Sequence, residues 1–542
     1  MKIRSTICSI LFLFLVCNTF SQGAPEIEWQ NTIGGSTDDL LYSVQQTSDG
    51  GYILGGSSNS DISGDKTEDN ISTYDYWIIK LDASGEVEWQ NNIGGTARDY
   101  PVSTQQTDDG GYILGGYSDS NLSGDKTEAS IGYDYWIIKI DSIGEIVWQN
   151  TIGGSLDDYL RSLDKTTDGG YILGGISRSG ISGDKTEASI GDWDYWVVKL
   201  NGSGIIEWQN TIGGHDYDDL QEIKQTTDGG YILGGFSESG ISGDKTETNI
   251  GSYDYWVVKL DALGDIEWQN TIGSTEMERL QAVEETIDGG YIIGGCSKGG
   301  ISADKNEAFI GGANEGDYWV LKLDALGNIE WQNTIGGSDD EILISLANIA
   351  YGGYIIGGHS HSEISGDKTE INVGSTTFTD YWVVKLNDEG DIEWQNTIGG
   401  GGYDELATVA QTTDGGFIVG GHSRSTASGD KTEPRIGAAN FFDYWIVKLY
   451  PEENEPCDAA PHGLSATNIT TNKAKLNWTA DALKYKVQYR ASTSPLWISL
   501  NATTNLKLIT GLAANTTYKY RVRSQCSAIL VSAWSNVAEF TT

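Results

Sequence analysis

Acidic side chains recur at a fixed place in the chain and are the first candidates for chemistry. One aspartate lies in each copy of a segment that reads Ser-Gly-Asp-Lys or close to it, at Asp65, Asp125, Asp184, Asp244, Asp304, Asp367 and Asp430. Further acidic runs, such as Asp157-Asp158, are expected in loops on the same face. Carboxylates combined with Ser, Thr and backbone carbonyl oxygens are the hard ligands that Ca²⁺ prefers. The sharpest hypothesis is therefore a calcium site at each of the seven aspartates.

The same segments also fit a purely structural role. Asp and Thr side chains bond to their own backbone in loops, and Lys66 is placed to pair with Glu68. The spacing differs from that of an EF-hand loop, and a lysine fixed in every copy opposes a dense cation cage. The structural interpretation is favoured, and calcium is kept as the alternative.

Other candidate residues give no catalytic assignment. His359 and His422 occupy the same repeat position, where Cys296 stands one copy earlier, so a transition-metal site is one interpretation and tolerated variation the favoured one. His-Glu-x-x-His and phosphate-loop motifs do not occur in the sequence, and no Gly-x-Ser-x-Gly nucleophile elbow, which needs a strand followed by a helix, is expected in an all-β chain. Seven near-identical sets of carboxylates indicate a scaffold, whereas a catalytic pair should break the symmetry in one copy. The copy that contains SADKNE and GSTEMER is the irregular one.

A repeat of about sixty residues must position all of these side chains. The tripeptide Trp-Gln-Asn starts at Trp29, Trp89, Trp148, Trp208, Trp268, Trp331 and Trp394, with spacings of 59 to 63 residues. The tripeptide Asp-Tyr-Trp also occurs once per copy, and each copy has an aromatic residue directly after the Gly-Gly that follows its predicted first strand. Each unit is predicted to form four antiparallel strands, for example near 160–167, 171–175, 195–200 and 205–212, with a tight Asp-Gly-Gly turn after the first. The repeated Tyr and Trp are expected in the core.

The phase of the repeat predicts how the array ends. The first complete element, 27–33, is a fourth strand, and the last copy stops after its third strand, 444–449. The leading strand can therefore complete the last unit and cover two sheet edges. The sequence predicts an all-β protein with a closed seven-bladed β-propeller over 27–450. An open solenoid is the alternative, although no capping unit is visible.

The pattern DGGYILGG…SGDKTE…DYWVVKLD…IEWQNTIGG resembles repeats of secreted β-propeller proteins of Bacteroidetes-type bacteria. This resemblance covers about four-fifths of the chain and implies the fold, but it implies no particular activity. A linker at 451–456 precedes residues 457–542, which resemble a fibronectin type III domain: Trp478 matches its core tryptophan and Tyr518 its tyrosine corner. Cys457 and Cys526 flank this module and are predicted to form a disulfide, as the resemblance also implies.

The N-terminus and the composition indicate where the protein works. Residues 1–21 have a basic start, an apolar stretch and a polar end, which predicts a cleaved signal peptide and a secreted or cell-surface protein. No stretch is long enough to span a membrane as a helix. The formal net charge of −43 excludes nucleic acid as a natural partner. Together these features predict a non-catalytic binding protein for an extracellular protein or glycan. The alternatives are a polysaccharide-acting enzyme with its site in the propeller channel, and a calcium-dependent adhesion component.

Overall fold

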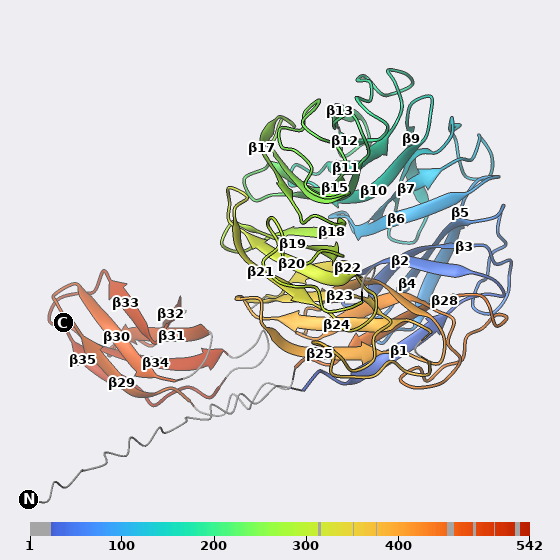
Figure 1. The fold of residues 1–542 in the computed structure, drawn as a ribbon. Coiled ribbons are helices and arrows are strands. Elements are labelled where there is room, and N and C mark those ends of the chain that lie inside the picture. Colours follow the sequence, from blue (N-terminus) through green and yellow to red (C-terminus); the bar gives the residue numbers. More distant parts are fainter. Residues whose placement is uncertain are drawn as a thin grey trace, which may run out of the picture.

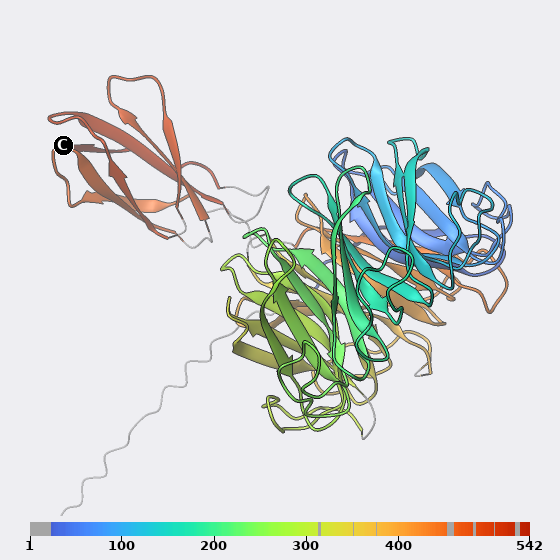
Figure 2. The same cartoon turned by 90° about the horizontal axis from the view of Figure 1, so that it is seen from above.

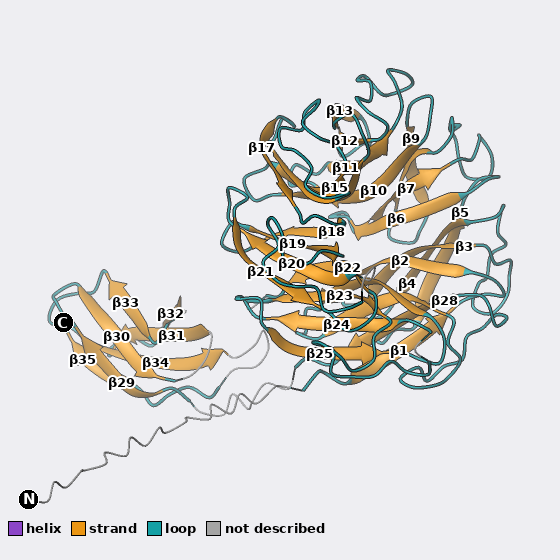
Figure 3. Ribbon diagram, viewed as in Figure 1, coloured by secondary structure: helices purple, strands orange, loops and turns teal. Residues whose placement is uncertain are grey.

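The computed structural model describes residues 23–312, 316–350, 352–375, 377–452, 460–480, 484–502, 504–525 and 532–542. In these ranges all named secondary-structure elements are β-strands (Figure 3). No helix of the described residues is long and apolar enough to cross a membrane. The expected signal peptide and both cysteines of the expected disulfide lie outside the described residues.

Seven four-stranded antiparallel sheets follow one another along the chain (Figure 1). We number them units 1 to 7. Units 1 to 3 contain β2 (Asp39–Gln46), β3 (Tyr52–Ser58), β4 (Asp75–Leu81) and β5 (Val87–Ile93); β6 (Asp99–Gln106), β7 (Tyr112–Ser118), β8 (Asp134–Ile140) and β9 (Ile146–Ile152); and β10 (Asp158–Lys165), β11 (Tyr171–Ser177), β12 (Asp194–Leu200) and β13 (Ile206–Ile212).

The remaining units repeat this order. Units 4 to 7 contain β14 (Asp218–Gln225), β15 (Tyr231–Ser237), β16 (Asp254–Leu260) and β17 (Ile266–Ile272); β18 (Glu278–Glu285), β19 (Tyr291–Ser297), β20 (Asp317–Leu323) and β21 (Ile329–Ile335); β22 (Glu341–Asn348), β23 (Tyr354–Ser360), β24 (Asp380–Leu386) and β25 (Ile392–Ile398); and β26 (Asp404–Gln411), β27 (Phe417–Ser423), β28 (Asp443–Leu449) and β1 (Ile27–Ile33).

In six of the seven units the hairpin between the first two strands follows from the sequence Asp-Gly-Gly, and unit 6 has Tyr-Gly-Gly at this place. In unit 3, Gly169 adopts a φ of 84°, a conformation that only glycine reaches without strain. The Asp168 carboxylate accepts a hydrogen bond from the Gly170 amide at 2.9 Å and thereby fixes the turn. This local chemistry sets the register of β10 and β11.

Large aromatic residues of the third strand fill the space between neighbouring units. Because side chains alternate along a strand, Tyr195 packs in the core shared with unit 4 and Trp196 in the core shared with unit 2. Both are fully buried. The Tyr195 hydroxyl donates to the Trp256 carbonyl of unit 4 at 3.2 Å, and a Cβ at Gly235 would lie 2.5 Å from this hydroxyl. Glycine at the second position of the Gly-Gly pair therefore lets adjacent sheets approach.

The same contact runs from each unit to the next and from unit 7 to unit 1. The Tyr444 hydroxyl donates to the Trp77 carbonyl at 3.2 Å, and side chains of both units share one core. The leading strand β1 pairs with β28, as the repeat phase predicts. Figure 2 shows the first (blue) and last (orange) units side by side.

The C-terminal residues form a β-sandwich. One sheet contains β29 (His462–Thr467), β30 (Lys473–Thr479) and β33 (Leu506–Thr510), and the other contains β31 (Lys484–Ala491), β32 (Ile498–Ala502), β34 (Thr517–Gln525) and β35 (Ala538–Thr541). Trp478 is buried between the sheets, as expected. The Tyr518 hydroxyl accepts a hydrogen bond from the Ala513 amide at 2.9 Å, which is the predicted tyrosine corner.

Candidate functional site

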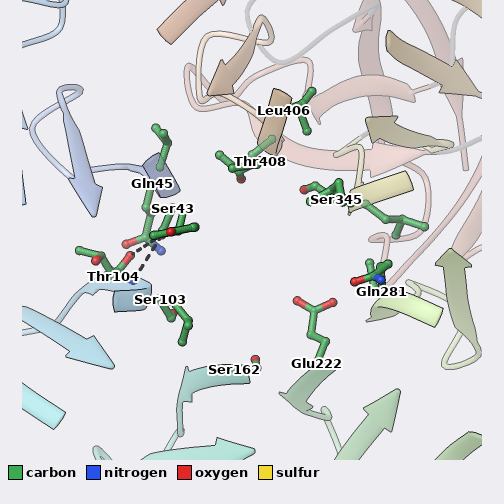
Figure 4. Close-up of a pocket in the computed structure, with 18 of the residues that line it drawn as sticks. Ser43, Gln45, Ser103, Thr104, Ser162, Glu222, Gln281, Ser345, Leu406 and Thr408 are labelled. Atoms are coloured by element: carbon green, nitrogen blue, oxygen red, sulfur yellow. Dashed lines mark hydrogen bonds between the residues drawn. The ribbon is translucent and has the colours of Figure 1, made fainter. Parts of the chain in front are cut away.

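The first strands of all seven units line one central cavity of about 810 Å³ (Figure 4). Each of these strands carries a β-bulge, so that one extra residue has no partner on the second strand. The seven bulged residues all line the cavity: Tyr42, Val102, Arg161, Gln221, Gln281, Ile344 and Ala407. The sequence analysis did not find these positions. They could have been found, because the residue type varies among the copies at this position while the residue before it is almost always leucine.

In units 1, 2, 3 and 6 a serine follows the bulge and ties neighbouring strands together around the cavity, whereas unit 5 has Ala282 there. The Ser43 hydroxyl donates to the Thr104 carbonyl at 3.4 Å and accepts from the Thr104 amide at 3.3 Å, as the dashed lines in Figure 4 show. Ser103 makes an equivalent bond to the Leu163 carbonyl at 3.2 Å. In unit 4 Glu222 takes over this position, and its carboxylate accepts from an amide of unit 5. These hydroxyls therefore hold the wall of the cavity.

The cavity is lined by charged side chains in only some of the units: Arg161, Glu222, Lys224 and Glu405. Lys224 lies 3.1 Å from the Glu222 carboxylate and 3.4 Å from that of Glu284. Burial raises the pKa of Glu284 to about 7, although Lys224 opposes the shift. Arg161 forms a bidentate pair with Asp219, with both contacts at 3.2 Å. These groups break the repeat symmetry inside the cavity, and their charges are paired within the protein.

The two histidines singled out in the sequence do face the same cavity. His422 Nε2 lies 3.3 Å from the Glu405 carboxylate, and His359 lines the wall nearby. Burial lowers the pKa of His359 to about 4, so this ring is neutral at pH 7. Cys296 is buried, and burial raises the pKa of its thiol. Among the described residues, no group of three or more His, Cys, Asp and Glu is arranged to hold a metal ion.

At one end of the sheets, half-buried aromatic side chains form a continuous set that we name the aromatic arc. Neighbouring ring centroids are 5.1–5.6 Å apart. The arc consists of Tyr74, Tyr100, Tyr117, Tyr133, Tyr159 and Trp193. These residues stand where first strands begin, second strands end or third strands begin, so antiparallel pairing places them at one edge. The repeat motifs do not include them, and the sequence analysis missed them.

The seven predicted calcium ligands join adjacent units. Each carboxylate accepts a hydrogen bond from a glycine amide after the fourth strand of the preceding unit, for example Gly153 to Asp184 at 3.2 Å. The other six bonds are 3.1–3.2 Å long: Asp65, Asp125, Asp244, Asp304, Asp367 and Asp430. These bonds run between units, whereas the structural interpretation expected each aspartate to bond the backbone of its own loop. Calcium binding at these residues stays a prediction.

The lysine of the same segment is buried and does not form the expected ion pair. Lys66 is only 1% exposed, and its ammonium donates to the Asn92 side chain at 2.6 Å rather than pairing with Glu68. It lies 5.4 Å from the Trp77 ring centroid. Burial lowers its pKa to about 8, and the nearby carboxylates of Asp39 and Asp75 oppose the shift. The expected surface ion pair is therefore wrong, because the lysine reaches inward to two buried acids.

The irregular fifth unit contains a structural exchange. In unit 1 the Ser60 hydroxyl donates to Asp39 at 3.2 Å, and a Cβ at Gly35 would lie 2.4 Å from Ser60. In unit 5 the two residues are swapped to Ser274 and Gly299, and the Ser274 hydroxyl donates to Glu278 at 2.6 Å. In both units a serine hydroxyl donates to the acid at the start of the first strand, but the serine comes from a different loop in unit 5. Packing therefore explains the exchange of serine and glycine in this unit.

The comparisons with known proteins concern mainly the C-terminal sandwich. Residues 459–541 match the fibronectin type III domain model. This match confirms the resemblance seen in the sequence. Similar solved structures include the one described as "Myokine structure" (17% identity, 16% of this chain, 97% of that chain, TM-score 0.15). A fibronectin type III domain of human collagen XX is another (21% identity, 16% of this chain, 98% of that chain, TM-score 0.14).

One curated protein aligns over 126 residues at 29% identity, namely the regulatory protein FlaEY of Caulobacter vibrioides. The alignment covers 23% of this chain and 13% of that protein. The chain thus spans about an eighth of the length of this relative.

Proposed function

We propose that the seven units are the blades of a closed β-propeller and that the protein is an exported, non-catalytic binding protein. Three observations support the closed ring: the pairing of β1 with β28, the hydroxyl contact from Tyr444 to unit 1, and a single cavity lined by all seven first strands. The repeat resemblance to secreted bacterial propellers and the N-terminal sequence support export.

The main support for a binding function is that the repeats differ most at the bulged residues that line the cavity. Immediately before each bulge the residue is leucine in six units and Pro101 in the other, and the side chain is buried. The bulged residue itself ranges from alanine to tyrosine and arginine, and it faces the cavity. In an array of near-identical units, fixed positions maintain packing, whereas variable positions at a concave site are free to contact a ligand.

The ligand class follows from the charge and the surroundings. A chain of net charge −43 disfavours polyanions, and the fibronectin type III domain is generally an interaction module. An extracellular protein or glycan therefore fits best.

An enzyme with its site in the channel is the second candidate. Glu284, with its pKa raised to about 7, is the observation in its favour, because a carboxyl group poised near neutral pH suits proton transfer; Glu284 contacts Lys224 of the cavity wall but is not itself among the lining residues. However, Lys224 links Glu284 and Glu222, and Glu222 also accepts a backbone bond. These contacts suit a structural charge cluster and favour binding without turnover.

The experiment is a binding screen with a chemical readout. Purified residues 22–542 are applied to arrays of neutral and anionic glycans and of extracellular proteins, and each retained ligand is recovered and analysed by mass spectrometry. We expect saturable binding and an unchanged ligand. Multiple turnovers of the recovered ligand would support the enzyme instead, and failure to retain any class would contradict a binding function.

A further inference from the structure

The aromatic arc spans units 1 to 3 and changes character elsewhere in the repeat. Just before the third strand stand Tyr74, Tyr133 and Trp193 in these units, and the same position holds Tyr253 in unit 4 and Phe442 in unit 7, but Gly316 in unit 5 and Thr379 in unit 6. The rings of unit 4 form a separate cluster of their own. The sheets themselves are near-identical, so the fold does not require this aromatic set. A feature that packing leaves optional and that gathers on one sector is a candidate contact surface.

The arc is continuous with the cavity. Tyr117 belongs to both, since it packs edge-on against Tyr159 at 5.1 Å and also lines the cavity. Tyr42 and Arg161 line the cavity on the same sector. A ligand that crosses the arc can therefore continue into the cavity without leaving a lined surface.

The side chains along this path are aromatic or uncharged apart from Arg161, whose charge is paired with Asp219. The arc offers aromatic faces and phenolic hydroxyls, and the adjoining wall offers neutral hydrogen-bonding groups such as Gln45, Gln105 and Ser103. Pyranose rings have apolar C–H faces edged by hydroxyl groups, which suits aromatic rings interleaved with neutral donors and acceptors. The strong negative charge of the chain disfavours sugars that carry carboxylates or sulfates.

We propose that the aromatic arc and the adjoining side of the cavity bind a neutral oligosaccharide. One end of the chain enters the cavity, and the following sugar rings stack across the arc toward Trp193. This inference rests on the proposed binding function and names its ligand class and the residues that select it.

The test is isothermal titration of residues 22–542 with neutral hexasaccharides: cellohexaose, xylohexaose, mannohexaose and laminarihexaose. A mannuronate hexasaccharide serves as the anionic comparison. The variants Tyr133→Ala and Tyr159→Ala remove arc rings, and Tyr159→Phe keeps the ring while it removes the hydroxyl. Tyr253→Ala is the matched control, because Tyr253 occupies the same repeat position as Tyr133 in unit 4, outside the arc.

We expect at least one neutral hexasaccharide to bind, with a Kd at least ten-fold higher for the two alanine variants than for Tyr253→Ala. Tyr159→Phe should retain most of the affinity, and near-ultraviolet circular dichroism should be unchanged in all variants. Should Tyr159→Ala fold poorly, Tyr159→Phe and Tyr133→Ala still decide the result.

Two results would overturn the inference. One is the absence of binding by all four neutral hexasaccharides at millimolar concentration, and the other is equal affinity of the arc variants and the control. A protein ligand that binds saturably in the array screen, without any saccharide binding, would leave the proposed function intact and contradict this inference alone.

Discussion

The substitution Tyr444→Phe probes whether unit 7 is joined to unit 1 by the same forces that join the other units. Tyr444 is fully buried, and its hydroxyl donates to the Trp77 carbonyl at 3.2 Å. Tyr195→Phe is the matched control in the middle of the array, where the hydroxyl donates to the Trp256 carbonyl at the same distance. Each substitution deletes one oxygen atom and leaves the ring in place.

The expected loss follows from one buried hydrogen bond. Such a bond contributes about 0.5–1.5 kcal/mol net, and an acceptor left unpaired can add to the loss. The carbonyl is already part of a sheet and has a second lone pair, so we expect the lower part of that range, about 1 kcal/mol. Because both contacts have the same geometry, the two variants should lose the same free energy of unfolding to within about 0.5 kcal/mol.

The measurement is equilibrium unfolding in urea, followed by tryptophan fluorescence, with the loss taken from the shift in the midpoint. Equal losses for Tyr444→Phe and Tyr195→Phe support a closed ring. A normal loss for Tyr195→Phe together with no loss for Tyr444→Phe would refute the closure, because it would mean that unit 7 does not depend on unit 1.

Three further predictions concern the buried charges and the acidic loops. Lys185→Met should lower the free energy of unfolding by about 3–5 kcal/mol at pH 7.5, because it strands buried carboxylates such as Asp194. The loss should be smaller at pH 5, since burial raises the pKa of Asp194; equal losses in urea unfolding at the two pH values would contradict this. Burial raises the pKa of Asp39 to about 7, so its contribution is complete below about pH 4 and is lost as the pH rises through 7. A hydrogen bond from Thr107 lowers the pKa of Asp109 to about 2, so that contribution is lost as the pH falls from 4 to 2. Between pH 2 and 7.5, below the range in which buried lysines such as Lys185 titrate, a pH series of unfolding midpoints should peak between about 4 and 6, and a maximum at pH 7 or above would contradict the assignment. If the acidic loops bind calcium, Ca²⁺ but not Mg²⁺ should raise the melting temperature, because each site filled at a hundred times its Kd adds about 2.7 kcal/mol to the free energy of unfolding. Asp184→Asn should reduce this rise. An unchanged melting temperature would mean that Asp184 serves only its bond with Gly153.

Much of the fold could be predicted because nearly the same local sequence features recur in all seven copies of the repeat. The Asp-Gly-Gly turn, the alternating Tyr195-Trp196 pair and the odd leading strand each have one physical interpretation, and the strand pairing agrees with all three. The glutamine of Trp-Gln-Asn bonds a neighbouring loop in the same regular way, as Gln30 does through the Asp430 carbonyl and the Thr432 amide. Periodicity alone carries this information.

The candidate site was harder to predict because it depends on departures from the repeat. The bulge that directs Arg161 into the cavity adds one residue to the first strand, and strand periodicity does not reveal it. The arc joins Tyr100 and Tyr117, which come from different strands and meet only through the register of the sheet. Lys66 was expected to pair with Glu68, and its true partners were missed because they come from other segments of the chain.

The central claim is that the cavity lined by the seven first strands is the binding site, and blocking it tests this most directly. Ala407 is the smallest of the bulged residues and faces the cavity, so Ala407→Trp places a large side chain there. Ser84→Trp, on an exposed turn between the third and fourth strands of unit 1, is the control. We predict that Ala407→Trp abolishes binding of the ligand found in the array screen, whereas Ser84→Trp binds it with unchanged affinity. Both variants should keep the melting temperature of the parent protein. Full affinity in a folded Ala407→Trp protein would contradict the claim.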